Sequence, residues 1–330
     1  MRRLHTAVWG LRAGLLAGTL ATAAFAQIPR DPLTQANAAL QAGEADKALG
    51  LIHSLPRAGL EIAEAQNLEC RVQFTLRQWD AAVHTCEQAV RLDGQNSNYH
   101  LWLGRALGEK AGRASFLSAF SLAKRVRAEF EEAVRLNPRN AEALSDLGEF
   151  YKEAPGIVGG GTDKAEGVAK QLDKVDAGRA HQLRARIAEG RKDYGTAERE
   201  FKYAIAASAH PALHWTTLAS FYRHRERWAE MEWAIHNCVN AAERDKHAGA
   251  ALYDGAGVLS EANRDPALAA RMLEDYLASS SKTEEAPAFE AHFRLARLKA
   301  QLGEAGSAQR ERVAALALAH DYKPEQESRH

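Results

Sequence analysis

The sequence has few cysteines, few aromatic residues and no excess of charge of either sign. Its 330 residues include three cysteines, too few for a disulfide-rich scaffold or a four-thiolate metal site. The 43 Lys and Arg residues are balanced by 43 Asp and Glu residues, so the chain lacks the basic excess that nucleic-acid-binding proteins use to replace phosphate counterions. Hydrophobic residues make up 46% and aromatic residues only 7%. This composition predicts an ordered, mostly helical protein.

The first 26 residues have the pattern of a secretory signal peptide. Arg2 and Arg3 provide a positively charged start, residues 13–29 form an uncharged run of 17 residues, and residues 24–26 read Ala-Phe-Ala, a small-x-small cleavage pattern. The alternative is a retained membrane anchor, but a spanning helix needs roughly 20 apolar residues. We therefore expect residues 1–26 to be cleaved, and the mature protein to be periplasmic or secreted without stable membrane insertion.

A repeat runs through the remainder of the chain. In residues 140–151, Leu144 is followed three residues later by Leu147-Gly148 and then by Tyr151. Residues 210–222 repeat this pattern with Ala in place of Gly. Spacings of three and four place these residues on one helix face, and the small residue stands where a second helix must approach closely.

A second helix follows each of these segments. Ala197, Phe201 and Ala204 recur at intervals of four and three, and Pro138 ends the third unit because proline cannot continue a helix. Together these residues resemble the tetratricopeptide repeat (TPR), a helix-turn-helix unit of about 34 residues. The resemblance implies an all-α fold, a right-handed α-solenoid of about eight TPR-like helical hairpins over residues 31–320, followed by a polar tail, 321–330. The units begin near Asp31, Ala63, Asn98, Ala141, Gly178, Ala212, Gly249 and Phe289.

Two insertions interrupt the repeat, near residues 110–121 and 154–162. Insertions in solenoids usually map to loops on one face. The second contains Pro-Gly-Ile-Val-Gly-Gly-Gly, and similar insertions occur in exported bacterial TPR proteins of unassigned function. Its glycines favour a tight turn. The alternative, a phosphate cradle, lacks the Gly-Lys-Ser/Thr ending of a P-loop.

The TPR alignment places Cys70 and Cys86 at facing positions of the two helices of the second unit. In an exported protein we expect this pair to form a disulfide. The alternative is two packed thiols that behave as small hydrophobic residues. Cys238 falls at a core position and is expected to be a lone buried thiol.

The sequence has no catalytic constellation. It has no His-Glu-x-x-His, no Gly-x-Ser-x-Gly and no paired-acid signature, and His214, His224 and His236 fall on different helix faces. We therefore expect no catalytic residue, no metal site and no cofactor. Two alternatives stay open. One is a hydrolase or thiol-dependent enzyme built on the helical array, and the other is a small-ligand or glycan-binding protein that uses the tryptophans Trp102, Trp215 and Trp228.

In TPR arrays, the helix A residue that follows the Leu-Gly pair lines the concave groove. In this chain that row reads Arg71, Arg105, Glu149, Arg186, Ser220, Gly257 and Arg297. The planar fork of arginine suits carboxylates and peptide carbonyls. The first four residues are therefore the candidate groove, for an anionic or C-terminal peptide, and the alternative is that these arginines are merely solvated. The prediction is an exported scaffold or adaptor that binds a protein or peptide partner in its concave groove, without catalysis.

Overall fold

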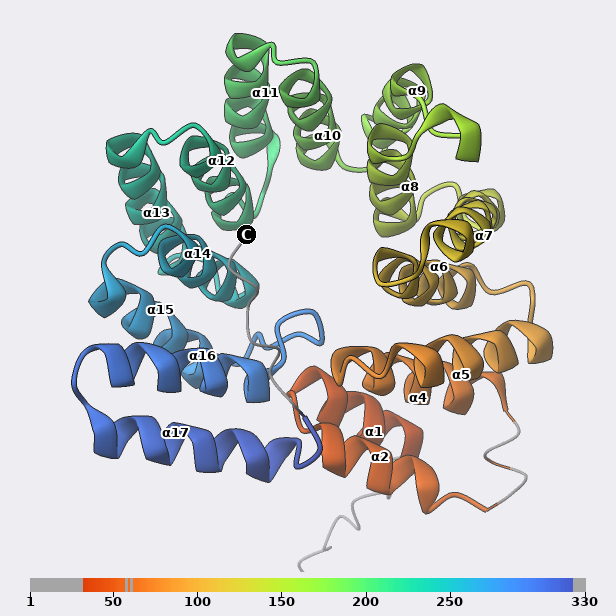
Figure 1. Cartoon of the computed structure of the whole chain (residues 1–330), viewed down its shortest axis with the longest axis horizontal. Helices are drawn as coiled ribbons and strands as arrows, with labels where there is room; N and C mark the ends of the chain where they lie inside the picture. Colours follow the sequence, from red (N-terminus) through yellow and green to blue (C-terminus); the bar gives the residue numbers. More distant parts are fainter. Residues whose placement is uncertain (1–31, 57–58, 60–61, 323–330) are drawn as a thin grey trace, which may run out of the picture. The chain divides into compact units, whose positions relative to one another are not determined.

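The computed structural model describes residues 32–56, 59 and 62–322, so the expected signal peptide lies outside the described residues. Within this part the chain forms 16 α-helices, paired as successive hairpins, and no named strand (Figure 1). The helices are α1 (Pro32–Gln41), α2 (Ala45–His53), α4 (Ala63–Thr75), α5 (Trp79–Leu92), α6 (Ser97–Gly112), α7 (Phe116–Leu136), α8 (Ala141–Glu153), α9 (Thr162–Leu172), α10 (Ala177–Gly190), α11 (Tyr194–Ala207), α12 (Ala212–His224), α13 (Trp228–Ala242), α14 (Gly249–Glu261), α15 (Pro266–Ala278), α16 (Ala288–Gln301) and α17 (Ala305–Leu318).

The all-α fold of about eight helical hairpins is confirmed. The first helix of each hairpin begins within one residue of the start expected from the repeat. Four of these starts coincide with the expected residue, and α6, α10 and α16 begin one residue earlier, at Ser97, Ala177 and Ala288. Asn140 and Asp176 cap α8 and α10, because their side chains accept hydrogen bonds from the backbone N–H groups of Ala143 and Arg179.

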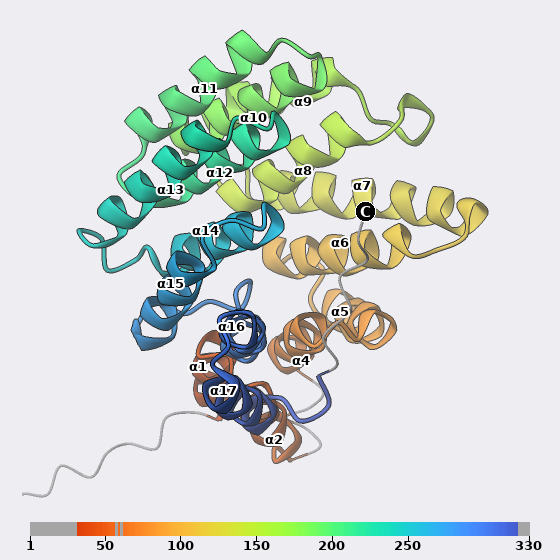
Figure 2. The same cartoon turned by 60° about the vertical axis from the view of Figure 1, so that its left-hand side comes forward.

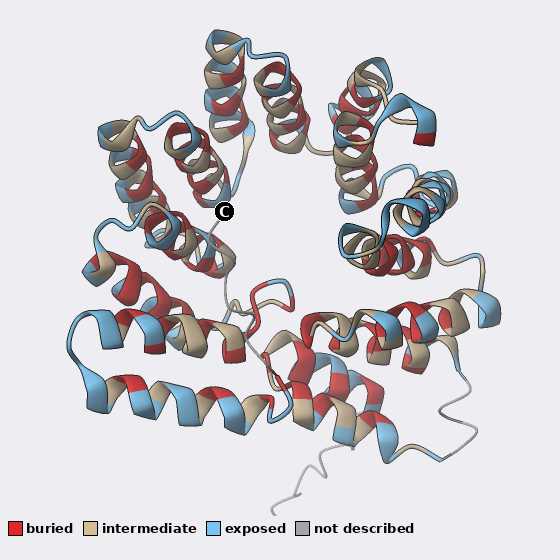
Figure 3. Cartoon of the chain, in the orientation of Figure 1, coloured by how far each residue is buried: buried red, intermediate tan, exposed pale blue. Residues whose placement is uncertain are grey.

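Small residues set the distance between packed helices, and the buried residues lie along the parts of each helix next to its neighbours (Figure 3). A Cβ atom added to Gly104 on α6 would lie 2.5 Å from the ring of Phe130 on α7, its partner within the hairpin. A Cβ atom added to Gly148 on α8 would instead lie 2.4 Å from Leu183 on α10. The repeat therefore uses the same small position in two ways, within a hairpin and between successive hairpins.

The two insertions take different forms. The first lengthens α6 to 16 residues and α7 to 21 residues, so it is a helical extension rather than the loop expected from the solenoid pattern. The physical reason is its composition, since residues 110–121 contain alanine, leucine and lysine but no proline. The second forms a turn after α8 that contains the short 3-10 helix η1 (Gly156–Val158).

The first and last hairpins are in contact (Figures 1 and 2). Leu33 of α1 and Ile52 of α2 share a buried cluster with Phe289 of α16 and with Tyr322. Tyr322 is only 3% exposed, and its ring centroid lies 4.7 Å from that of Phe289. The expectation of a polar tail from residue 321 is therefore wrong at Tyr322, because this ring covers the apolar surface between the two ends of the array.

Two glycines on α6 provide a matched test of the helix contact. Gly104→Ala should lower the free energy of unfolding by about 1–3 kcal/mol, because the added methyl group overlaps Phe130. Gly108→Ala meets no atom within 4 Å and should raise stability by about 0.5–1 kcal/mol, since alanine favours the helix over glycine. Urea unfolding of both variants measures the difference. Equal effects of the two substitutions would contradict the packing described for Gly104.

Candidate functional site

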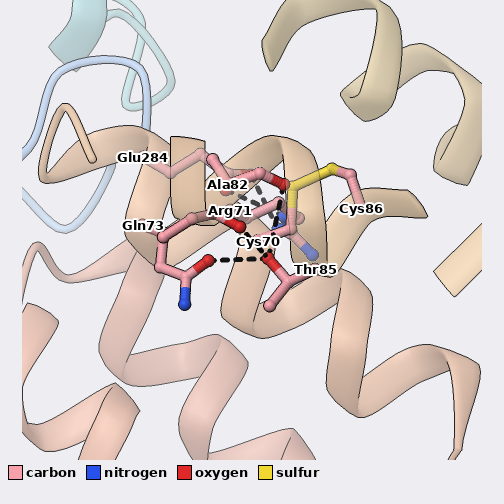
Figure 4. The surroundings of a disulfide bond; sticks show 8 residues. Cys70, Arg71, Gln73, Ala82, Thr85, Cys86 and Glu284 are labelled. Atoms are coloured by element: carbon pink, nitrogen blue, oxygen red, sulfur yellow. Dashed lines mark hydrogen bonds and ion pairs between the residues drawn. A yellow bond between two sulfur atoms is a disulfide. The ribbon is translucent and has the colours of Figure 1, made fainter. Parts of the chain in front are cut away.

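Arg71, the first residue of the candidate groove, forms an ion pair with another residue of the same chain, Glu284. Its Nε and Nη2 atoms donate to the two carboxylate oxygens of Glu284 at 2.9 and 2.6 Å, and Nη2 also donates to Asn37 at 3.1 Å. Gln41 of α1 donates to the same carboxylate at 3.0 Å. The side chains of Arg71 and Glu284 are 18% and 6% exposed, so this two-pronged ion pair is largely removed from water (Figure 4).

Arg105 on α6 is also paired. Its Nε donates to Asp146 of α8 at 2.6 Å and its Nη2 donates to Glu142 at 3.1 Å, while Nη1 lies 3.8 Å from Glu285. Burial disfavours the charged guanidinium, but the nearby carboxylates of Asp146, Glu142 and Glu285 together outweigh this and raise the pKa of Arg105. The guanidinium also lies over the ring of Trp102, 4.7 Å from its centroid.

The remaining two candidates pair with each other. Nε of Arg186 on α10 lies 3.3 Å from Glu149 on α8, and their side chains are 40% and 34% exposed. Glu149 also lies 3.5 Å from Nζ of Lys152. This pair is therefore open to solvent, unlike the two preceding arginines of the row.

The alternative interpretation, that the groove arginines are merely solvated, is wrong for Arg71 and Arg105, because both form ion pairs and are largely buried. The acids that pair with Arg71, and in part with Arg105, come from residues 279–287, the segment that joins α15 to α16. Tyr276, which is fully buried, anchors this segment by donating to the backbone oxygen of Ala286. Sequence reasoning missed this segment because its two acids, Glu284 and Glu285, lie outside the repeat, and Glu284 is 213 residues from Arg71.

A cavity of about 480 Å³ is lined mainly by residues of α10, α12, α14 and α16. Three residues of the predicted row, Arg186, Ser220 and Gly257, line it together. Arg77, which follows α4, and Glu290 on α16 line the same cavity, so both ends of the array contribute to its wall. The full set of charged residues on the wall comprises five carboxylates against three guanidinium groups: Glu189, Asp254, Glu261, Glu285 and Glu290 against Arg77, Arg186 and Arg294.

A second cavity of about 500 Å³ borders α8, α10 and α12 and contains an uncharged histidine. His214 is 6% exposed, and its Nδ1 atom lies 3.0 Å from the Gln182 amide oxygen. Burial lowers the pKa of His214 to about 4, so the ring is neutral at pH 7. No group of three or more His, Cys, Asp or Glu residues among the described residues is placed to hold a metal ion.

The structure places Cys70 on α4 and Cys86 on α5 in a disulfide, with Cα atoms 5.3 Å apart (Figure 4). Arg71, directly after Cys70, carries the ion pair to Glu284. The disulfide therefore ties α5 to the helix that contacts the far end of the chain. Cys238 is the free cysteine, and burial raises its pKa to about 12.

The three tryptophans do not form one cleft. Trp102 is buried at 6% exposure within the core of the first half of the array. Trp215 and Trp228 pack partly buried against the core of the second half, and Trp215 contacts Trp233 with ring centroids 5.1 Å apart. These three tryptophans therefore form no shared binding surface. None of the described helices is both long and apolar enough to span a membrane.

The chain is similar to tetratricopeptide-repeat proteins. A thermophilic TPR protein, TTC0263 of Thermus thermophilus, is 19% identical, with 58% of this chain and 96% of that chain covered and a TM-score of 0.48. MamA is 20% identical, with 50% of this chain and 89% of that chain covered and a TM-score of 0.40.

A curated relative, Superkiller complex protein 3 of Mus musculus, is 26% identical over 145 residues. These residues make up 43% of this chain and 8% of the relative, so the chain spans less than a tenth of that protein's length. No family model matches the chain.

The disulfide predicts a loss of stability when it is removed. The free energy of unfolding of the Cys70→Ala, Cys86→Ala double variant should be about 3 kcal/mol lower than that of the wild type, because the disulfide closes a loop of 16 residues in the unfolded chain. Thiol titration of the denatured, unreduced protein should find one reactive thiol, from Cys238. Three thiols would show that the pair is not oxidised in the isolated protein.

The ion pairs predict that alanine substitutions along the arginine row lower stability to different extents. Arg71→Ala should lower the free energy of unfolding by about 3–5 kcal/mol, since it leaves the carboxylate of Glu284 buried without its partner. Arg186→Ala removes the more exposed pair with Glu149 and should lower the free energy of unfolding by about 0–1 kcal/mol. Urea unfolding, with hydrogen exchange of α1 and α16 as a local readout, compares the two variants. A small effect of Arg71→Ala would contradict its role in joining the two ends of the array.

Proposed function

We propose that the mature chain is an exported TPR scaffold that binds a protein or peptide segment on its concave side and has no catalytic activity. The cavity of about 480 Å³, lined by Arg186, Ser220 and Gly257 from successive hairpins, is the observation that carries the proposal. Stacked hairpins bury a continuous core and leave such an extended surface for partners.

The charges of the cavity favour a segment without strong negative charge. The hydroxyl groups of Thr216, Thr217 and Ser220 line the wall and can hydrogen-bond to a polar segment. Its carboxylates outnumber its guanidinium groups, and Arg71 and Arg105 are engaged by the chain's own acids. The acidic or C-terminal peptide considered from the sequence is therefore not the ligand that this geometry supports best.

The state of the cysteines supports export and argues against thiol-dependent catalysis. A disulfide persists in an oxidising compartment, which agrees with the proposal that residues 1–26 are a cleaved signal peptide. The thiol of Cys238 is fully buried and its raised pKa leaves it protonated at pH 7, so it cannot act as an accessible nucleophile.

Site-specific photo-crosslinking tests the proposal. A photoreactive amino acid replaces Ser220 in the cavity, or Ala317 on α17 as the control, and each variant is produced in the source cells and irradiated. Ser220 is half-buried in the cavity wall, whereas Ala317 is exposed and lies outside every cavity described above. We expect covalent protein adducts from position 220 and few from position 317. Adducts only from position 317, or none from either, would overturn concave binding.

A further inference from the structure

The most exposed large hydrophobic side chains among the described residues gather at the two insertions. Phe116 is 85% exposed, Leu117 is 80% exposed and Ile157 is 75% exposed. Every other large hydrophobic side chain of the described part is at most 58% exposed. Adjacent exposed Phe and Leu residues are unusual on a soluble surface and indicate a contact that the isolated chain does not make.

These three side chains occupy neighbouring tips. Phe116 and Leu117 form the first turn of α7, at the end of the extended α6–α7 hairpin, and Ile157 lies in η1. The turn after α8 contacts α7, because Nη1 of Arg127, ten residues beyond Leu117, donates to the backbone oxygen of Val158 at 3.3 Å. Figure 2 shows the α6–α7 tip and the turn after α8 projecting on the same side.

The first tip is basic. Between Glu109 and Glu129 the chain has five basic residues and no Asp or Glu: Lys110, Arg113, Lys124, Arg125 and Arg127. Four of them form ion pairs: Lys110 with Asp80 and Arg125 with Glu87 on α5, Arg113 with Glu109 on α6, and Arg127 with Glu131 on α7. The basic side chains of these pairs are 40%, 44%, 43% and 34% exposed, in that order. Exposed pairs of this kind contribute about 0–1 kcal/mol each, so a phosphate can replace the carboxylate at little cost.

The small apolar area of the two tips favours a lipid surface over a protein as the partner. An aromatic side chain buries about 150–250 Å², so three side chains of at most this size offer no more than about 750 Å². A stable protein interface needs about 800 Å² from each partner and a complementary surface around it. Docking on a lipid surface needs neither a large area nor a complementary shape, because the lipid surface adapts to protruding apolar side chains and supplies anionic phosphates for the basic residues beside them.

We propose that the two insertion tips dock this protein on an anionic lipid surface. Phe116, Leu117 and Ile157 enter the boundary between headgroups and acyl chains, while the basic side chains of residues 110–127 contact lipid phosphates. The chain lies on the surface and does not span it. The concave cavity takes no part in this contact, so the inference is independent of the function proposed above.

Vesicle flotation with the full chain tests the docking surface. Phosphatidylglycerol-containing vesicles are compared with phosphatidylcholine vesicles, for the wild type, for Phe116→Ser with Leu117→Ser, and for Val313→Ser with Leu316→Ser as the control. The control residues are the exposed hydrophobic side chains of α17, at 58% and 46% exposure. All three proteins share residues 1–30, so any lipid affinity of that segment is common to them.

We expect the Phe116 and Leu117 variant to bind phosphatidylglycerol vesicles about tenfold more weakly than the wild type, and the control to bind as the wild type does. Wild-type binding should also weaken as salt is raised. Circular dichroism verifies that each variant is folded. Equal binding of the two double variants, or equal binding of the wild type to both vesicle types, would overturn the proposal. Loss of self-association instead of vesicle binding, measured by sedimentation velocity, would assign the tips to a second copy of the chain.

Discussion

An array of stacked hairpins has two apolar ends, and the covering of those ends is the constraint on which this structure depends. Here each end covers the other, since Leu33 and Ile52 of the first hairpin share a buried cluster with Phe289 and Tyr322. The contact brings residues 279–287 to the concave face and places Glu284 against Arg71. The charge of the candidate site is thus a consequence of how the array ends, and not only of its repeat.

Features that depend on local spacing could be predicted from the sequence. Helix faces repeat every three or four residues, so the small and bulky positions fixed the helix starts to within one residue. The same register placed Cys70 opposite Cys86, and the structure has their Cα atoms 5.3 Å apart. A buried lone Cys238 followed from its core position.

Features that depend on contacts distant in sequence could not be predicted. Nothing in the repeat indicates that Glu284, 213 residues from Arg71, reaches that guanidinium, so a row of arginines gave the impression of a cationic groove. Gly148 resembles Gly104 in the pattern, yet its neighbour is Leu183 of the following hairpin. The carboxylates of Asp254 and Glu285 likewise reach the cavity from positions outside the aligned row.

The contact between the first and last hairpins also has a consequence for synthesis. A chain made from its amino terminus completes α1 and α2 long before Phe289 and Tyr322 exist. Until then the apolar surface of the first hairpin is uncovered and exposed to aggregation. Closure is a contact of high sequence separation, and such contacts form slowly. A nascent or truncated chain that ends before α16 therefore exposes the apolar surface of its first hairpin, whereas the finished chain covers this surface by itself.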